Sequence, residues 1–461
     1  MLRQAADPGV AKAIEALLSD SVDRNLNRIN ALQFADRLKL DPGRTIAGFL
    51  QATRLGLFDL SWNVMCPGCG GVLGAGTTLK SVNRSEYTCA LCAAGYEPTL
   101  DEMVEVTFTV NPRIRSIEAH APDQLPFVEY YRQIFWTTGI VLPDNFEQKL
   151  DAITLERVEL PPRERAILSL TVEPQFLIVF DPVTHASQFL NIEGEPTRER
   201  QNVSFVLDEQ LRQNETINLR PGPLRVALEN RTSRRTLPGI WIANEEMHDL
   251  IGRRRPVLTA KRVLSHQTFR DLYRTGMLDL DQRLKITSLT FMFTDLKGST
   301  RLYDRVGDLA AFDLVLAHFR LLEEIIAGRD GAVVKTIGDA VMATFTRPED
   351  AIVAALDMRS AMQRFNADHQ AAEDELLIKI GLHQGPCLAV TLNERQDYFG
   401  QTVNVASRVQ ELAGSQEIIA TEPIVTDAGA SRVLLDRRLS PMPRQHPIDG
   451  LKGAMSLFSL P

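Results

Sequence analysis

The chain has 461 residues, and its 51 lysines and arginines against 59 aspartates and glutamates give a formal net charge of −8. This length predicts about three domains, and a mildly acidic chain of ordinary apolar content argues against a protein that mainly coats nucleic acid or acidic lipid. The N-terminus lacks a signal-like apolar stretch, and the longest apolar run, at 176–180, is too short to span a bilayer. We therefore expect a cytoplasmic location and no membrane partner.

Residues 1–60 predict a helical module. Apolar residues recur at helical spacing in 11–18, and the same spacing appears in 32–38 and 45–54, on either side of a turn at 41–43. Two helices joined by a short turn are compatible with a winged-helix unit that binds DNA. Because basic and acidic residues nearly cancel in this segment, a small packing or dimerisation module is the favoured interpretation, and nucleic acid is an unlikely partner.

Four of the five cysteines form two CxxC pairs within residues 61–98. Two such knuckles about 20 residues apart predict a zinc ribbon in which four thiolates hold one Zn²⁺ ion. The closed tetrahedral shell indicates a structural zinc, with unmetallated core cysteines as the alternative. The predicted ligands are Cys66, Cys69, Cys89 and Cys92.

Residues 99–262 predict a β-sandwich that serves as a regulatory domain. Short runs with period-two or continuous apolar character lie between Pro, Gly and Asn residues, and a helical stretch near 127–135 interrupts them. The region shows no catalytic spacing, so a surface for an unknown regulatory ligand or protein and an inert scaffold are both open. Strands are expected at 104–110, 175–180, 203–207, 224–230 and 239–243.

Residues 263–285 predict a connector. Its apolar positions fit one helix. Such a helix can couple the two folded regions that it joins, or it can be an inert linker.

Residues 286–461 alternate strand and helix in a pattern that predicts a ferredoxin-like α+β sandwich. The fold alone says little about activity. We expect strands at 286–293, 332–335, 340–345, 376–382 and 387–391, the last two as a pair, and helices at 309–327 and 351–365.

Two aspartates stand at the ends of predicted strands in this last region, in the segments Phe-Thr-Asp295-Leu-Lys-Gly and Lys335-Thr-Ile-Gly-Asp339-Ala. Two carboxylates at strand ends form a hard-oxygen site suited to Mg²⁺ or Mn²⁺. These ions usually hold a triphosphate, so the pair predicts a nucleotide site.

A helical segment downstream, Thr402-Val-Asn404-Val-Ala-Ser-Arg408, places an asparagine and an arginine four residues apart on one face. Arg408 can stabilise charge on a phosphate, and Asn404 can orient a ribose. Seen alone, Arg408 would more simply pair with a surface acid. Its position shortly after Asp397 favours the functional interpretation.

Together these segments resemble the catalytic domain of class III nucleotidyl cyclases, the adenylate and guanylate cyclase family. The resemblance covers 286–461 and implies attack of a ribose 3′-hydroxyl on the α-phosphate, with pyrophosphate leaving. It implies two metal ions at Asp295, Asp339 and the backbone carbonyl of Leu296, and a triphosphate contact from Lys452. The ribbon and sandwich resemble, less closely, a region found ahead of some bacterial cyclase domains.

The resemblance also implies the base. Lys335 and Asp397 match the positions that recognise adenine in this family, because lysine donates to N1 and aspartate accepts from the 6-amino group. Guanylate cyclases typically carry a glutamate and a small residue there. We therefore expect an adenylate cyclase that converts ATP to cyclic AMP, with a guanylate cyclase, or a non-catalytic protein that senses nucleotide or binds a partner, as the alternatives.

In this family the metal-binding and base-binding residues of one site come from opposite partners of a dimer. This one chain has both sets, which implies a homodimer with two equivalent sites. Each site would combine Asp295 and Asp339 of one subunit with the base and phosphate residues of the other. Those residues are Lys335, Asp397, Asn404 and Arg408.

Overall fold

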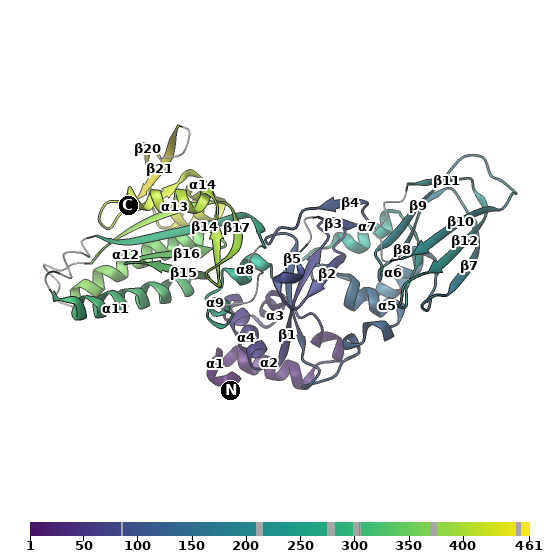
Figure 1. Cartoon of the computed structure of the whole chain (residues 1–461), viewed down its shortest axis with the longest axis horizontal. Helices are drawn as coiled ribbons and strands as arrows, with labels where there is room; N and C mark the ends of the chain where they lie inside the picture. Colours follow the sequence, from purple (N-terminus) through teal and green to yellow (C-terminus); the bar gives the residue numbers. More distant parts are fainter. Residues whose placement is uncertain are drawn as a thin grey trace. The chain divides into compact units, whose positions relative to one another are not determined.

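The structure, a computed structural model, describes residues 1–83, 86–208, 215–273, 282–297, 304, 306–368, 376–448 and 453–461. The chain divides into two compact units (Figure 1): unit 1 contains 1–98 and 102–258, and unit 2 contains 99–101 and 259–461. The helical module, the cysteine segment and the β-rich region, expected as three domains, thus share unit 1. No helix in the described ranges is both long and apolar enough to cross a membrane.

Two early helices of unit 1, at Pro8–Asp20 and Pro42–Arg54, begin at Asp-Pro pairs. Asp7 accepts hydrogen bonds from the backbone N–H groups of Gly9 and Val10, and Asp41 accepts one from that of Arg44. Aspartate caps the free amides, and proline has no N–H to satisfy in the first turn. The predicted turn at 41–43 is therefore the start of a helix. The helices are α1 (Leu2–Ala5), α2 (Pro8–Asp20), η1 (Asp23–Leu26), α3 (Ala31–Leu38) and α4 (Pro42–Arg54).

These helices adjoin a three-stranded sheet of order β2-β1-β5, to which α4 packs through β1. Phe49 of α4 stacks on Phe108 of β5 and lies against Phe58 of β1, so aromatic burial joins helix and sheet. The expected strand 104–110 is present, but it pairs with β1 and lies outside the sandwich. The elements are β1 (Phe58–Met65), β2 (Val72–Gly76), η2 (Leu79–Ser81), β3 (Tyr87–Cys89), β4 (Ala94–Tyr96) and β5 (Val104–Val110).

The rest of unit 1 is a two-sheet sandwich with strand orders β10-β12-β7 and β11-β9-β8-β13-β6. Their inward residues, such as Val179, Leu190 and Val226, form one buried apolar cluster. The helical stretch at 127–135 is also present, with a π-helical second half. Its strands are β6 (Thr154–Arg157), β7 (Arg165–Val172), β8 (Gln175–Asp181), β9 (Ala186–Ile192), β10 (Gln201–Leu207), β11 (Ile217–Leu219), β12 (Gly222–Asn230) and β13 (Gly239–Ile242). Its helices are η3 (Glu118–His120), η4 (Pro122–Gln124), α5 (Phe127–Tyr130), η5 (Tyr131–Phe135), α6 (Phe146–Ala152) and α7 (Glu245–Gly252).

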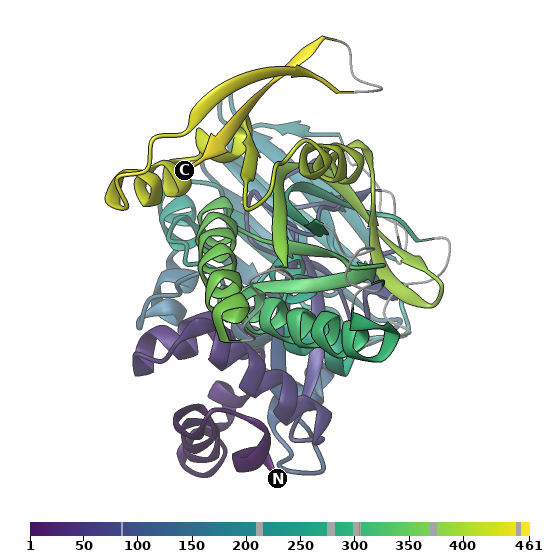
Figure 2. The same ribbon diagram turned by 90° about the vertical axis from the view of Figure 1, so that its left-hand side faces the viewer.

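Unit 2 is built on a sheet of order β15-β16-β14-β17-β19-β21-β20, with β18 paired to β17. Helices α11 and α12 lie side by side along the sheet (Figures 1 and 2) and share a core with Ile418 and Ala420 of β19. Ile419, which lies between Ile418 and Ala420 in β19, points to the other face of the sheet and packs with α13. Helix α13 therefore covers the face opposite to α11 and α12. The strands are β14 (Leu284–Lys297), β15 (Gly331–Ile337), β16 (Ala340–Phe345), β17 (Leu377–Leu392), β18 (Arg395–Phe399), β19 (Ile418–Thr421), β20 (Met442–Pro447) and β21 (Ala454–Leu460). The helices are α8 (Ala260–Leu264), α9 (Gln267–Leu272), α11 (Asp308–Ala327), α12 (Pro348–Asp368), α13 (Gln401–Glu411), α14 (Glu422–Val425) and α15 (Ala428–Asp436).

Two predictions about unit 2 are wrong in detail. Residues 376–382 and 387–391 do not pair with each other, because they belong to the single strand β17. Pro386 lies where the β14–β17 register shifts, and an irregularity of this kind tolerates a residue without an N–H. The connector likewise forms two short helices, α8 and α9, in place of one, with a break at Ser265 and His266.

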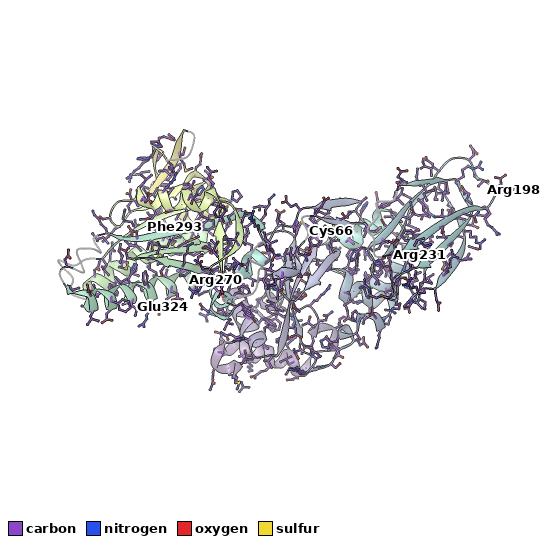
Figure 3. All side chains as sticks on the ribbon, viewed as in Figure 1. Cys66, Arg198, Arg231, Arg270, Phe293 and Glu324 are labelled. Atoms are coloured by element: carbon purple, nitrogen blue, oxygen red, sulfur yellow. The ribbon has the colours of Figure 1, made fainter. Side chains whose placement is uncertain are left out.

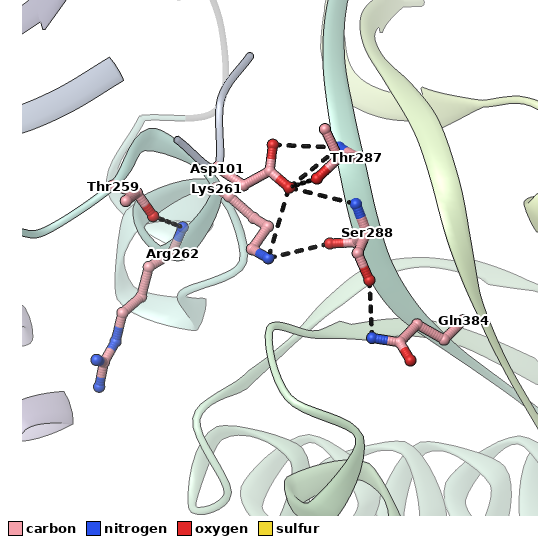
Figure 4. A network of polar contacts seen from close by, with 7 residues as sticks. All are labelled: Asp101, Thr259, Lys261, Arg262, Thr287, Ser288 and Gln384. Carbon is pink, nitrogen blue, oxygen red and sulfur yellow. Dashed lines mark hydrogen bonds and ion pairs between the residues drawn. The ribbon is translucent and has the colours of Figure 1, made fainter. Parts of the chain in front are cut away.

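Residues 99–101 belong to unit 2 because they bind the irregular part of β14 (Figure 4). The Asp101 carboxylate accepts hydrogen bonds from the backbone N–H groups of Thr287 and Ser288, which lie where the ladder to β17 is interrupted. Lys261 of α8 donates to the Ser288 carbonyl at 3.0 Å and lies 3.9 Å from the Asp101 carboxylate. Asp101 thus satisfies amides that the bulge leaves without ladder partners.

Candidate active site

The two predicted metal ligands lie close together at one end of the sheet. Asp295 follows Thr294, which is opposite Val341 on β16, and Asp339 lies in the turn just before β16. Gly338 in that turn has a φ of 63°, a conformation that glycine adopts without strain. The tight β15–β16 turn therefore brings the Asp339 carboxylate beside Asp295.

The electrostatics of this carboxylate pair indicate a cation site. The pKa of Asp295 is raised, mainly by burial and secondly by the charge of Asp339. One buried oxygen of Asp339, Oδ2, has no hydrogen-bond partner within the described part of the chain. A divalent ion would neutralise the repulsion and occupy that oxygen, so the donor set fits Mg²⁺ or Mn²⁺. The side chain of Leu296, the residue after Asp295, is buried in the core. Leu296 could therefore bind a metal ion only through its backbone carbonyl oxygen.

Lys335 and Asp397, the predicted base-recognition residues, form an ion pair. The Lys335 Nζ atom lies 2.5 Å from Asp397 Oδ2, and the two side chains are 42% and 10% exposed. Asp397 also accepts a hydrogen bond from the Tyr398 N–H at 2.8 Å. The structure therefore brings together a donor and an acceptor that lie 62 positions apart in the chain.

Asn404, which is exposed, and Arg408, which is half-buried, lie on helix α13, and this helix packs against β17. Two glycines of β17 allow this close approach, because a Cβ at Gly381 would collide with the backbone of Gln410 and one at Gly385 would meet Thr402. Within the described residues, no carboxylate lies within 4.0 Å of the Arg408 guanidinium. The simpler interpretation of Arg408, an ion pair with a surface acid, therefore has no support here.

The metal ligands and the base pair meet β17 at different points. Asp295 is opposite Lys379 on β17, whereas Asp397 is opposite Val390 on the same strand, eleven residues further along. Within the described residues, Lys335 forms its ion pair with Asp397 and none with Asp295 or Asp339.

One predicted site residue, Lys452, lies outside the described residues. His383 is described: its Nδ1 lies 2.8 Å from Thr421 Oγ1, and burial lowers its pKa to about 4. A neutral, hydrogen-bonded ring in the sheet indicates a structural role for His383.

Sequence reasoning missed Arg270, a residue of α9 labelled in Figure 3. Its guanidinium donates to the carbonyls of Val333 and Val334 on β15 and to that of Gln396 on β18. It therefore ties together the two strands that carry Lys335 and Asp397. Because its partners are backbone carbonyls, no motif in the sequence could have revealed this contact.

The four cysteines of unit 1, with Cys66 labelled in Figure 3, converge as predicted. Their sulfurs all lie within 4.8 Å of one another, and none of the four forms a disulfide. Four convergent thiols on two knuckles can hold one metal ion in a closed shell. The cysteines are also packed with Phe135 and Trp136, so the site is part of the unit 1 core.

Two family models match this chain, and the boundary between them lies near the boundary between units 1 and 2. Residues 282–433 match the family model described as adenylate and guanylate cyclase catalytic domain. Retinal guanylyl cyclase 1 of Homo sapiens is 33% identical over 133 residues, and adenylate cyclase 1 of Rhizobium meliloti is 30% identical over 134. These matches cover 26% of this chain but only 12% and 20% of those proteins.

Among solved structures, the adenylyl cyclase CyaB from P. aeruginosa is 19% identical, with a TM-score of 0.35, and the match covers 39% of this chain and 95% of that one. Residues 1–271, more than half of the chain, match a family described as a family of unknown function, DUF5939. The chain therefore belongs to this DUF5939 family and has, in its second unit, a class III adenylate and guanylate cyclase catalytic domain.

Proposed function

We propose that this protein is an adenylate cyclase that converts ATP to 3′,5′-cyclic AMP and pyrophosphate. The observation that carries the proposal is the Asp295–Asp339 pair, in which two neighbouring carboxylates include a buried oxygen without a partner. Bound Mg²⁺ or Mn²⁺ ions would supply charge neutralisation at the phosphates and lower the pKa of the attacking hydroxyl. The other site residues then have to bind and orient the substrate.

Adenine is the favoured base because of the Lys335–Asp397 pair. A lysine Nζ can donate to N1 of adenine, and a carboxylate can accept from its 6-amino group. Guanine reverses both roles, and a mismatch of buried hydrogen-bonding groups discriminates strongly. In this proposal Asn404 orients the ribose, and Arg408, which is free of neighbouring carboxylates in the described structure, stabilises charge on the α-phosphate.

We further propose that the active form is a homodimer. Lys335 forms its ion pair with Asp397 and none with Asp295 or Asp339 in the described residues, so the base pair and the metal carboxylates can serve different sites, as expected if a complete site needs residues of a second copy. Ile337 and Phe399, next to the key residues of β15 and β18, are 52% and 64% exposed. Large apolar side chains exposed beside a reaction site are typical of an interface.

The direct test measures cyclic nucleotide formation by the full chain with ATP and separately with GTP, in Mn²⁺ and in Mg²⁺. Cyclic AMP from ATP, with little product from GTP, is expected. Product from GTP alone would contradict the base assignment. No product under any condition, in a protein whose folding is verified, would contradict the cyclase proposal itself.

A mixing experiment tests the shared site. Asp295→Ala and Asn404→Ala chains should each be inactive, while co-refolded mixtures should regain roughly a quarter of wild-type activity, because half of randomly paired dimers carry one intact site of two. Purified heterodimers without activity would rule out the proposed division of residues.

A guanylate cyclase is the second candidate, and a specific observation favours it: several of the relatives at about one-third identity are guanylyl cyclases. Those relatives match over the catalytic domain alone. The Lys335–Asp397 pair favours ATP, so the assay with both substrates decides between the two.

We also propose that Cys66, Cys69, Cys89 and Cys92 hold a structural Zn²⁺ ion in unit 1. Elemental analysis of the purified chain should find one zinc per chain, and Cys69→Ser should lose it and lower the melting temperature of unit 1. Zinc at wild-type stoichiometry in Cys69→Ser would place the metal elsewhere.

A further inference from the structure

Unit 1 contains a cavity that the cyclase reaction does not use. It has a volume of about 270 Å³ and lies among η1, the loop after it, α3, η5 and the loop after η5. Its wall includes five arginines, which are Arg24, Arg28, Arg37, Arg132 and Arg255, and it includes no aspartate or glutamate. We call this space the arginine cavity.

The positive charge of this cavity is only partly balanced by the protein. Glu129, behind the wall, lies 2.8 Å from Arg24 and 3.5 Å from Arg132. For Arg28, Arg37 and Arg255, no carboxylate lies within 4.0 Å in the described part of unit 1. The buried Glu105 acts on Arg28 only at longer range, and its carboxylate is bound by Thr138.

Arg28 donates to the Ile134 carbonyl and Arg255 to the Ile140 carbonyl, but neither half-buried guanidinium group has a carboxylate within 4.0 Å in the described part of unit 1. Burial lowers the pKa of Arg28 and of Arg255. Arg28 also has a positive φ of 44°, which is uncommon for a residue with a side chain. Half-buried arginines without nearby carboxylates can be neutralised by a bound anionic ligand.

The unsatisfied polar atoms of the wall are donors. Within the described structure, the Nε of Arg255 and the Nε1 of Trp136 are buried and have no hydrogen-bond partner. The wall also offers amide and hydroxyl side chains, including Asn25, Gln133 and Thr137. A ligand rich in oxygen acceptors would satisfy such donors.

We propose that the arginine cavity binds a small, multiply charged oxyanion, an organic phosphate or a polycarboxylate. Guanidinium groups bind both classes through paired N–H···O contacts. The cavity is smaller than most sites for drug-sized molecules, so the ligand is compact. Because the arginines come from segments around positions 24–37, 132 and 255, the ligand would also join distant parts of unit 1.

Binding is measured by isothermal titration calorimetry on the full chain, with inorganic phosphate and with tricarballylate as probes. Chloride keeps the ionic strength constant, and divalent metals are left out so that the carboxylate site of unit 2 does not bind phosphate through them. Saturable binding of either probe, at one per chain, is expected. The probe that binds more tightly identifies the ligand class.

Arg255→Met and Arg37→Met should each weaken this binding by about tenfold or more, since each removes charged donors. Arg37 is exposed, so its variant should fold even if the buried position is sensitive, and melting curves verify both. Arg198→Met, at an exposed arginine of unit 1 labelled in Figure 3, is the matched control and should bind as wild type does. The absence of saturable binding at about 10 mM of either probe, or binding that both cavity variants retain, would overturn the proposal. The result does not depend on cyclase activity.

Discussion

The two units differ in how their functional residues are arranged along the chain. In unit 2, Lys335 and Asp339 are four positions apart, and Asn404 and Arg408 share one helical turn. In unit 1, the arginine cavity collects residues from three distant segments. The candidate site residues of unit 2 lie in short segments that leave compact sequence signals, whereas a cavity lined by residues from distant segments leaves none.

The largest expected effect concerns the compact site. Asp339→Asn keeps the shape of the side chain but removes a metal-binding charge, so cyclase activity should fall by about 10³-fold, equivalent to roughly 4 kcal/mol of transition-state stabilisation. Initial rates with ATP and Mn²⁺ measure the loss. Asp436→Asn, at an exposed aspartate of the same unit, is the control and should be neutral. Near-normal rates in Asp339→Asn would remove the metal assignment.

The base pair should show the next largest effect. Lys335→Met removes the proposed donor to adenine and leaves the buried Asp397 carboxylate without its ion-pair partner. The ratio of kcat/KM for ATP to that for GTP should fall by about 10²-fold. Asp397→Asn provides a second variant of the same pair. If kcat/KM falls equally for ATP and GTP, so that their ratio is unchanged, Lys335 is a positioning residue and does not recognise the base.

Acid should destabilise unit 2 more than it destabilises unit 1. Burial lowers the pKa of His318, which is fully buried in unit 2, to about 4. Between about pH 6.5 and pH 4 the unfolded chain takes up a proton that the folded unit refuses, so unit 2 loses up to about 3 kcal/mol of stability as pH falls. The buried Asp181 of unit 1 has a raised pKa, and acid favours its folded state.

Differential scanning calorimetry of the full chain from pH 7.5 to 5 measures this difference. The unit 2 transition should move down more steeply with acid than that of unit 1. His318→Leu should flatten its slope. An unchanged slope in this variant would show that His318 does not titrate as proposed.

The smallest effect is expected from Arg270, which touches strand backbones and no predicted substrate contact. Arg270→Met should loosen β15 against β18 and raise KM for ATP by up to about tenfold, since charge-assisted hydrogen bonds contribute on the order of 1.5–3 kcal/mol. Steady-state kinetics separate this from a change in kcat. Arg270→Lys keeps one donor group and should recover part of the loss.

The amino-acid sequence by itself determined the helical segments at 11–18, 32–38 and 45–54, most strands, the two CxxC knuckles and the local motifs around Asp295, Asp339 and Arg408. These features depend on neighbours within a few positions, where periodicity, capping and turn chemistry act directly. The same local rules failed at Pro386, where pairing with β14 keeps the strand continuous, and at 104–110, which joins β1 and not the sandwich.

Only the tertiary structure decided which distant residues meet. It paired Lys335 with Asp397, placed Arg270 across β15 and β18, bound Asp101 to the bulge of β14 and gathered five arginines around one cavity. These contacts arise because burying apolar faces fixes how sheets and helices pack, and polar groups brought together by that packing must then satisfy one another or a ligand. No spacing along the chain encodes such meetings.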